Sequence, residues 1–234
     1  MALRRLGLVL VVAAVLLLSL ASETASPEGL IVVRGAWSGS HLKLAVGGDA
    51  LIVNGYMATA EPAGCRFTHG RNAAVCPLAG AGSIEVDMGP AGDKVEVLDP
   101  LPIPLTAHLG AGSDKFIGNA EPDTCYPEGT RRNRCIGGPG NDICITGPKN
   151  TDCVGGAGND YCAGGAGSDG CWGGPGRDVC RMGDGQDGCH GEGGDDRLYG
   201  GSGSDQLYGG LRFDYCDGGS GVGRSHDCEA GPRH

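Results

Sequence analysis

Aromatic side chains are scarce in this sequence, whose 234 residues include only three Phe and two Trp. Glycine occurs 47 times and proline 13 times. Such a composition is typical of low-complexity, disordered chains, because it offers little apolar surface to bury. A strict sequence period, described below, overrules that interpretation.

Positive charge is also scarce, since 18 Lys and Arg face 28 Asp and Glu, which gives a formal net charge of -10. This balance disfavours nucleic acid and anionic lipid as partners and favours cations. Catalytic motifs are missing as well: the sequence has no HExxH, GxSxG or GxxxxGK[ST], and its six histidines are scattered. We therefore expect the protein not to be an enzyme.

The sequence has one long apolar run, from Leu6 to Leu20, which follows Arg4 and Arg5 and precedes the small residue Ala21. This pattern predicts a cleaved signal peptide over residues 1–21, with an uncleaved membrane anchor as the alternative. No later segment is apolar enough to span a bilayer. Twelve cysteines in an exported chain indicate an oxidising compartment. We expect a secreted, extracellular protein, either free or associated with the cell surface.

A nine-residue unit repeats from Gly137 onward, beginning GGPGNDICI, TGPKNTDCV, GGAGNDYCA and GGAGSDGCW and ending in GGSGVGRSH. A fixed short period predicts a solenoid, in which each unit contacts only its neighbours. Glycines at the first, second and fourth places permit a tight turn. The last three residues of each unit alternate as a short strand, x-U-x.

The U position of successive units is filled as follows: Cys144, Cys153, Cys162, Cys171, Cys180, Cys189, Leu198, Leu207 and Cys216. Because leucine shares this position with cysteine, we expect U to point inward and its neighbours outward.

An aspartate usually fills the sixth place. If two units make one coil, one edge carries Asp142, Asp160, Asp178, Asp196 and Asp214, and the other carries Asp169, Asp187 and Asp205. Rows of like charge require a counter-ion, and calcium takes about 6–8 oxygen ligands. Each unit buries one side chain while ordering nine residues of backbone, so we expect the array to fold only when metal binds.

Turn carbonyls beside these carboxylates complete the predicted calcium ligands. They lie near Gly138, Gly140, Gly156, Gly158, Gly165, Gly167, Gly174, Gly176, Gly201 and Gly203.

The segments GGPGND, GGAGND, GGAGSD, GGPGRD and GGSGSD resemble the GGxGxDxUx nonapeptide of the RTX, or haemolysin-type calcium-binding, family. The resemblance covers about residues 137–226, with weaker echoes at 109–117 and 89–97. It implies a right-handed parallel β-roll, with calcium between turns on the same side. The leader and the cysteines are more similar to secreted calcium-binding repeat proteins of actinobacteria.

Three units depart from the pattern. Unit 146–154 has Lys149 and Thr151 at the fourth and sixth places, so we expect no ion there. Arg212 replaces a glycine, and Gly223 replaces the last aspartate, which is typical of a cap. Pairing the intact turns on each edge predicts about six calcium ions, four on one edge and two on the other.

Residues 22–108 carry short alternating strands broken by Gly, Asp or Pro. Their spacing suits irregular solenoid coils, which we favour, or a small sandwich. The expected organisation is an all-β chain with a signal peptide (1–21), a β-rich region (22–108), a calcium-binding β-roll (109–226) and a C-terminal cap (227–234).

Three pairs of cysteines are disulfide candidates that close short loops: Cys65 with Cys76, Cys125 with Cys135, and Cys216 with Cys228. The six consecutive U cysteines offer bonds along a strand ladder, such as Cys144 with Cys162 or Cys153 with Cys171, because neighbouring strands lie about 4.8 Å apart. The alternative is that they are buried and unbonded. A zinc site is disfavoured, because there is no CxxC pair.

The sequence thus predicts a calcium-binding structural repeat protein whose β-roll folds on binding extracellular calcium. The alternative is a calcium-stabilised adhesive module for cell-envelope polymers or a protein partner. That alternative would use an outward stripe formed by Trp37, Trp172, Tyr199 and Tyr208, although ordinary exposed aromatics are the favoured interpretation of these residues.

Overall fold

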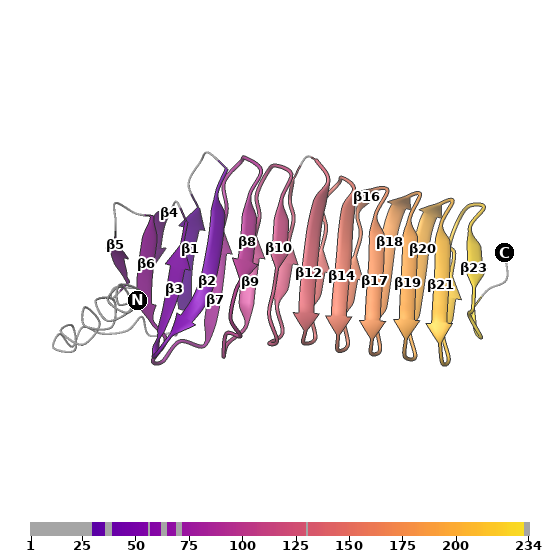
Figure 1. Cartoon of the computed structure of the whole chain (residues 1–234). Coiled ribbons are helices and arrows are strands. Elements are labelled where there is room, and N and C mark those ends of the chain that lie inside the picture. The colour runs from indigo at the N-terminus through magenta and orange to yellow at the C-terminus, as the bar shows by residue number, and fades with distance from the viewer. Residues whose placement is uncertain are drawn as a thin grey trace, which may run out of the picture.

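The structure is a computed structural model that describes residues 30–35, 39–55, 57–61, 65–68, 72–129 and 131–231. The expected signal peptide, residues 1–21, lies outside the described residues. The described chain is all β, and its parallel coils stack into an elongated solenoid, as expected (Figure 1). None of the described residues belongs to a helix long and apolar enough to cross a membrane.

Two long sheets form the solenoid. The first sheet contains β1 (Leu30–Gly35), β4 (Met57–Glu61), β7 (Ser83–Asp87), β9 (Leu105–His108), β11 (Thr124–Tyr126), β13 (Ile143–Ile145), β15 (Tyr161–Ala163), β16 (Ala166–Gly167), β18 (Val179–Gly185), β20 (Arg197–Gly203) and β22 (Tyr215–Asp217). The second sheet contains β2 (His41–Gly47), β3 (Ala50–Asn54), β5 (Arg66–Thr68), β6 (Ala73–Pro77), β8 (Lys94–Val97), β10 (Lys115–Ile117), β12 (Asn133–Pro139), β14 (Thr151–Ala157), β17 (Gly170–Pro175), β19 (Gly188–Gly193), β21 (Gln206–Leu211) and β23 (Arg224–His226). From β7 onward the chain visits the two sheets alternately, apart from the short β16, which follows β15 in the same sheet.

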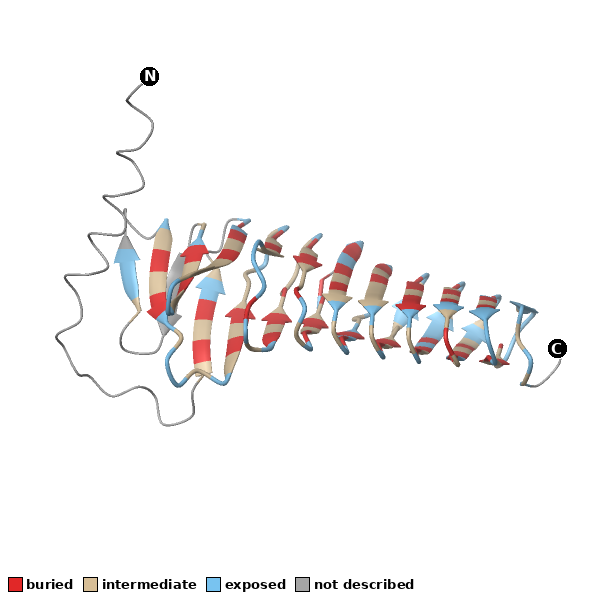
Figure 2. Ribbon diagram, turned by 60° about the horizontal axis from the view of Figure 1, so that its bottom comes forward, coloured by how far each residue is buried: buried red, intermediate tan, exposed pale blue. Residues whose placement is uncertain are grey.

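The strand register confirms that two nine-residue units make one coil. Cys144 pairs with Cys162 in parallel in the first sheet, and Cys171 pairs with Cys189 in the second, each 18 residues apart. The U side chains point inward, as predicted, and Cys180, Leu198 and Leu207 are fully buried. Figure 2 shows the resulting alternation of buried and more exposed positions along the strands.

The N-terminal region continues the same two sheets as irregular coils. β1 pairs in parallel with β7, and β2 with β8, so both sheets run unbroken into the repeats. Antiparallel strands close the N-terminal end: β4 pairs with β1, β3 with β2, and β6 with β3 and β5. The core there is filled by larger side chains, including Leu42, Leu44 and Ile84.

The three disulfide candidates that close short loops are present in the structure: Cys65–Cys76, Cys125–Cys135 and Cys216–Cys228. Cys125 and Cys135 are themselves U residues of facing strands, β11 and β12, because Cys125 pairs with Cys144 and Cys135 with Cys153 in the sheets. The period therefore continues N-terminal to Gly137, where the insertion of Pro127 conceals it.

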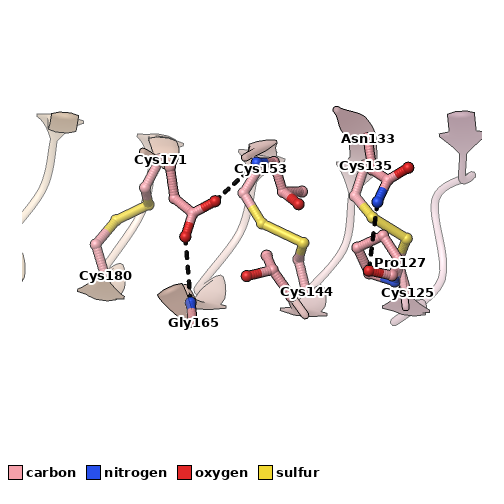
Figure 3. Close-up of a disulfide and its surroundings, with 12 residues drawn as sticks. Cys125, Pro127, Asn133, Cys135, Cys144, Cys153, Gly165, Cys171 and Cys180 are labelled. Carbon is pink, nitrogen blue, oxygen red and sulfur yellow. Dashed lines mark hydrogen bonds between the residues drawn. A yellow bond between two sulfur atoms is a disulfide. The ribbon is translucent and has the colours of Figure 1, made fainter. Parts of the chain in front are cut away.

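The expected disulfides along a strand ladder are wrong. Cys144 bonds to Cys153 and Cys171 to Cys180, from one sheet to the other across the core (Figure 3), with Cα–Cα separations of 6.4 and 6.3 Å. Packed sheets usually lie about 10 Å apart. The small cysteine side chains allow a much thinner core here, which brings facing residues within bonding range. Cys162 and Cys189 are buried and unbonded.

Candidate metal-binding turns

The sixth-place aspartates form two hydrogen-bonded ladders, one along each edge of the solenoid. On the first edge, the backbone N–H of each aspartate donates to Oδ1 of the aspartate one coil later, from Asp123 through Asp142, Asp160, Asp178 and Asp196 to Asp214, at 2.7–2.9 Å. On the second edge, Asp169, Asp187 and Asp205 are linked in the same way at 2.7 and 3.0 Å. The structure thus brings together the two sets of carboxylates that the period predicted.

These carboxylates are buried, and most have one oxygen without a hydrogen-bond partner. No sixth-place aspartate of the repeats is more than 6% exposed. Oδ2 is buried without a partner in seven of them: Asp142, Asp160, Asp178, Asp187, Asp196, Asp205 and Asp214. In Asp169, Oδ2 accepts a hydrogen bond from the N–H of Gly165 at 3.2 Å. A buried carboxylate oxygen without a donor is costly, so these atoms favour a bound cation.

The electrostatics of the ladders favour the neutral carboxyl when no cation is bound. Burial, with smaller contributions from neighbouring carboxylates, raises the pKa of Asp142 and Asp178 to about 7. Burial likewise raises the pKa of Asp187 and Asp196 to about 6. A divalent ion between the turns would oppose both causes, because it supplies the positive charge that the buried carboxylates lack.

Glycines form the walls of the turns. A Cβ added to the first-place Gly137 or Gly155 would lie 2.2 Å from Oδ2 of the aspartate in the same unit. A Cβ added to the second-place Gly156 would lie 1.9 Å from the carbonyl oxygen of Gly138, and one on the fourth-place Gly158 would lie 1.5 Å from that of Gly140. Carbonyl oxygens of successive turns are therefore stacked along the edge.

The same stacking recurs at most of the other predicted carbonyl positions. An added Cβ meets the carbonyl oxygen of the turn one coil earlier at Gly165, Gly174, Gly176, Gly201 and Gly203. At Gly167, the nearest atoms belong instead to Asn150 and Lys149 of the degenerate unit. Carboxylate and carbonyl oxygens are the hard donors that calcium prefers, so the residues present fit this ion.

Unit 146–154 contributes no carboxylate to its ladder. Thr151 occupies the sixth place and is buried, and its N–H donates to Oδ1 of Asp169 at 2.7 Å. The neighbouring Asp152 lies on the outer face, where Oδ1 is 2.9 Å from the guanidinium of Arg132. The unit therefore lacks the donor set of the intact turns.

Three ladder aspartates were missed from the sequence: Asp93, Asp114 and Asp123. All three are buried, and each takes the sixth place of an irregular unit. The weak echoes at 89–97 and 109–117 were the available signal for Asp93 and Asp114. For Asp123, the inserted Pro127 shifts the frame of the repeat.

The structure does not place Trp172, Tyr199 and Tyr208 in the single stripe that the adhesive alternative would use, and Trp37 lies outside the described residues. Tyr199 lies in β20 of the first sheet, where Arg181 covers its ring at 4.6 Å, whereas Trp172 and Tyr208 lie in the second sheet. There, the rings of Trp172, His190, Tyr208 and His226 stack in order, with centroids 5.8, 4.7 and 5.0 Å apart. Side chains flanking U in consecutive units point from opposite sheets, so Tyr199 is separated from the row that contains Trp172 and Tyr208.

Two further groups of potential ligands in the described part of the chain lie outside the ladders, and one of them, Cys144, Cys153 and Cys162, already contains the Cys144–Cys153 disulfide. Side-chain atoms of Glu85, Asp87 and His108, all on the outer face of the first sheet, lie within 4.8 Å of one another. Arg34 already approaches Asp87 at 3.3 Å, and Glu128 approaches His108 at 3.6 Å. The geometry is that of a surface charge network.

Residues 154–171 and 190–223 match the family model described as RTX calcium-binding nonapeptide repeat, in four copies. Searches of the curated proteins and of the solved structures found no match. The matched residues include aspartates from each ladder: Asp160, Asp196 and Asp214 from the first, and Asp169 and Asp205 from the second. Sequence and geometry therefore agree on calcium-binding repeats in this part of the chain.

Proposed function

We propose that this chain, which carries RTX calcium-binding nonapeptide repeats, is a secreted structural protein whose β-roll folds as it binds extracellular calcium. Its role is that of a rigid extracellular element, free or attached to the cell surface. Calcium is scarce inside cells and abundant outside, so such a chain would remain unfolded until export.

The observation that carries the proposal is the row of buried, unpartnered Oδ2 atoms along each edge. On the first edge, the five consecutive aspartates Asp142 to Asp214 make four pairs of neighbouring turns. On the second edge, Asp187 and Asp205 make one pair. Asp169 and Asp187 make another pair. Its affinity for calcium is expected to be lower, because Oδ2 of Asp169 already accepts a hydrogen bond from the N–H of Gly165. These pairs would hold about six ions, by the oxygen-ligand chemistry of calcium.

Folding and binding are coupled in this proposal because the chain has little else to stabilise it. The repeat core consists mainly of one Cys or Leu per unit, and each coil made of two intact units brings two more buried carboxyls. Without a cation, those groups must either lose their charge or bear an uncompensated desolvation cost. With calcium, binding free energy becomes folding free energy.

Asp178→Asn tests the proposal. The amide keeps an oxygen that can accept the N–H of Asp160 but removes the charge from the middle of the first ladder. We expect the calcium-driven gain of β circular dichroism to require higher calcium and to become less cooperative. Asp152→Asn, at an acidic residue outside the ladders, is the matched control and should titrate as the wild type does. Equal titrations for all three proteins would refute the ligand assignment.

The stacked rings of the second sheet do not favour the alternative of an adhesive module. Trp172, His190, Tyr208 and His226 stack face to face, so neighbouring rings cover one another. The proposed function is therefore calcium binding by the aspartate ladders, and not adhesion through the aromatic residues.

A further inference from the structure

Two turns near the N-terminal end repeat the ladder geometry outside the residues that match the RTX model. Turn 88–93 ends in Asp93 and turn 109–114 ends in Asp114, and these residues are 4% and 3% exposed. The N–H of Asp93 donates to Oδ1 of Asp114 at 2.8 Å, and the N–H of Ser40 donates to Oδ1 of Asp93. In both aspartates, Oδ2 is buried and has no hydrogen-bond partner.

The backbone around these carboxylates is shaped as in the repeats. Gly110 and Gly112 have φ of 67° and 156°. A Cβ on Gly110 would lie 2.4 Å from the carbonyl oxygen of Gly89, and one on Gly112 would lie 2.3 Å from that of Ala91. Turn 88–93 therefore directs carbonyl oxygens at turn 109–114, next to the two carboxylates.

Neighbouring ladder positions show how a turn is completed without a metal. On the first edge, Oδ2 of Asp123 accepts hydrogen bonds from the backbone N–H of Asn119 at 2.7 Å and from its side-chain amide at 3.0 Å. On the second edge, the coil after Asp114 carries Asn133, whose neutral amide oxygen accepts the N–H of Asp114 at 2.8 Å. At Asp123, the amide groups of Asn119 thus take the place of a cation, and at Asn133 the side chain carries no charge to compensate. No side chain in the described structure does this for Asp93 or Asp114. Burial raises the pKa of Asp93, and only the backbone amides of Ser40 and Gly89 oppose that shift.

We infer that turns 88–93 and 109–114 form a further calcium site, with Asp93 and Asp114 as its carboxylate ligands and turn carbonyls as its other protein donors. The site holds a single ion, because Asn133 ends the run of carboxylates on one side and Ser40 on the other. It shares the ion of the proposed function but none of the ligands in the repeats. It stabilises the junction where irregular coils meet regular ones, between β8 and β10.

The test is the calcium content of the full chain, measured by equilibrium dialysis in saturating calcium followed by elemental analysis. Asp114→Asn should lower the content by about one ion per chain, because the pair loses a charged ligand. Asp152→Asn is the control, since this carboxyl lies outside the ladders and pairs with Arg132, and its ion content should equal that of the wild type. Circular dichroism in calcium checks that each variant is folded.

Asp93→Asn provides an independent second variant, which decides the matter if Asp114→Asn does not fold. It should also lose about one ion, and the double variant should lose no more than either single one. A wild-type ion content in the folded Asp93 or Asp114 variant would overturn the inference.

Asp178→Asn, measured in parallel, separates this inference from the proposed function. Loss of calcium in Asp178→Asn but not in Asp93→Asn or Asp114→Asn would overturn the N-terminal site and leave the repeat sites standing. A wild-type chain that binds no calcium would overturn both.

Discussion

At the scale of the residue, the fourth-place glycines are required by the coil beneath them. Gly158 has a φ of 138°, and an added Cβ would lie 1.5 Å from the carbonyl oxygen of Gly140. We predict that Gly158→Ala lowers the free energy of unfolding in saturating calcium by at least about 1–3 kcal/mol, because backbone strain adds to the steric clash. Urea denaturation measures the change.

Gly188→Ala is the control for this substitution, because a Cβ at Gly188 would meet no atom within 4 Å. It should leave the urea midpoint nearly unchanged. Equal losses at the two positions would show that chain flexibility, and not stacking, explains the glycines.

The stacked coils can also impose the turn conformation on residues other than glycine. Glu192 and Arg212 stand in place of glycines and still adopt φ of 73° and 93°.

At the scale of the structural element, the disulfides connect facing strands and leave two thiols enclosed. Burial raises the pKa of the Cys162 and Cys189 thiols above their ordinary value. Because the thiolate is the reactive form, we predict that both resist alkylation in the calcium-loaded protein and react after denaturation. Mass spectrometry of alkylated peptides gives the extent of reaction at each cysteine.

The same digest tests the pairing, because trypsin cleaves after Arg177 and Arg181 and so separates Cys171, Cys180 and Cys189. Peptide 178–181, which holds Cys180, should stay linked to peptide 150–177 through Cys171. Peptide 182–197 should be released alone, with Cys189 alkylated. A link between 178–181 and 182–197 would contradict this arrangement and indicate that Cys180 bonds to Cys189.

Much of this element-level order could be predicted from the sequence, because a nine-residue period fixes which positions share a face and which turns share an edge. The period predicted both aspartate edges and the inward U position. It did not predict the ladder role of Asp123, because one inserted residue changes the frame. It also suggested U disulfides between neighbouring strands of one sheet, whereas the bonds join the two sheets. The distance between sheets depends on the side chains that fill the core, which the period does not specify. The antiparallel closure by β3 to β6 depends on long-range pairing that no local pattern specifies.

At the scale of the whole molecule, the ladders make stability depend on pH in opposite senses with and without calcium. In the metal-free fold, burial raises the pKa of Asp142 and Asp178 to about 7 and of Asp187 and Asp196 to about 6, from an ordinary value of 3.8. A folded state with raised carboxyl pKa values holds more protons than the unfolded chain. The contribution of these carboxyls to the free energy of unfolding is therefore fully present below about pH 4 and is lost as the pH rises through about 7.

We therefore predict that metal-depleted protein, which the proposed coupling leaves largely unfolded at about pH 8, gains β structure as the pH is lowered to about 5, because the neutral carboxyls avoid the repulsion of the ladders. In excess calcium the pH dependence reverses, since protons compete with the ion for the same oxygens and weaken binding at the lower pH. Circular dichroism of chelating-resin-treated protein across this pH range, and melting curves in added calcium, measure the two effects. A metal-free β content that rises between pH 5 and pH 8 would contradict the raised carboxyl pKa values, and with them the buried, uncompensated state of the ladders on which the calcium proposal depends.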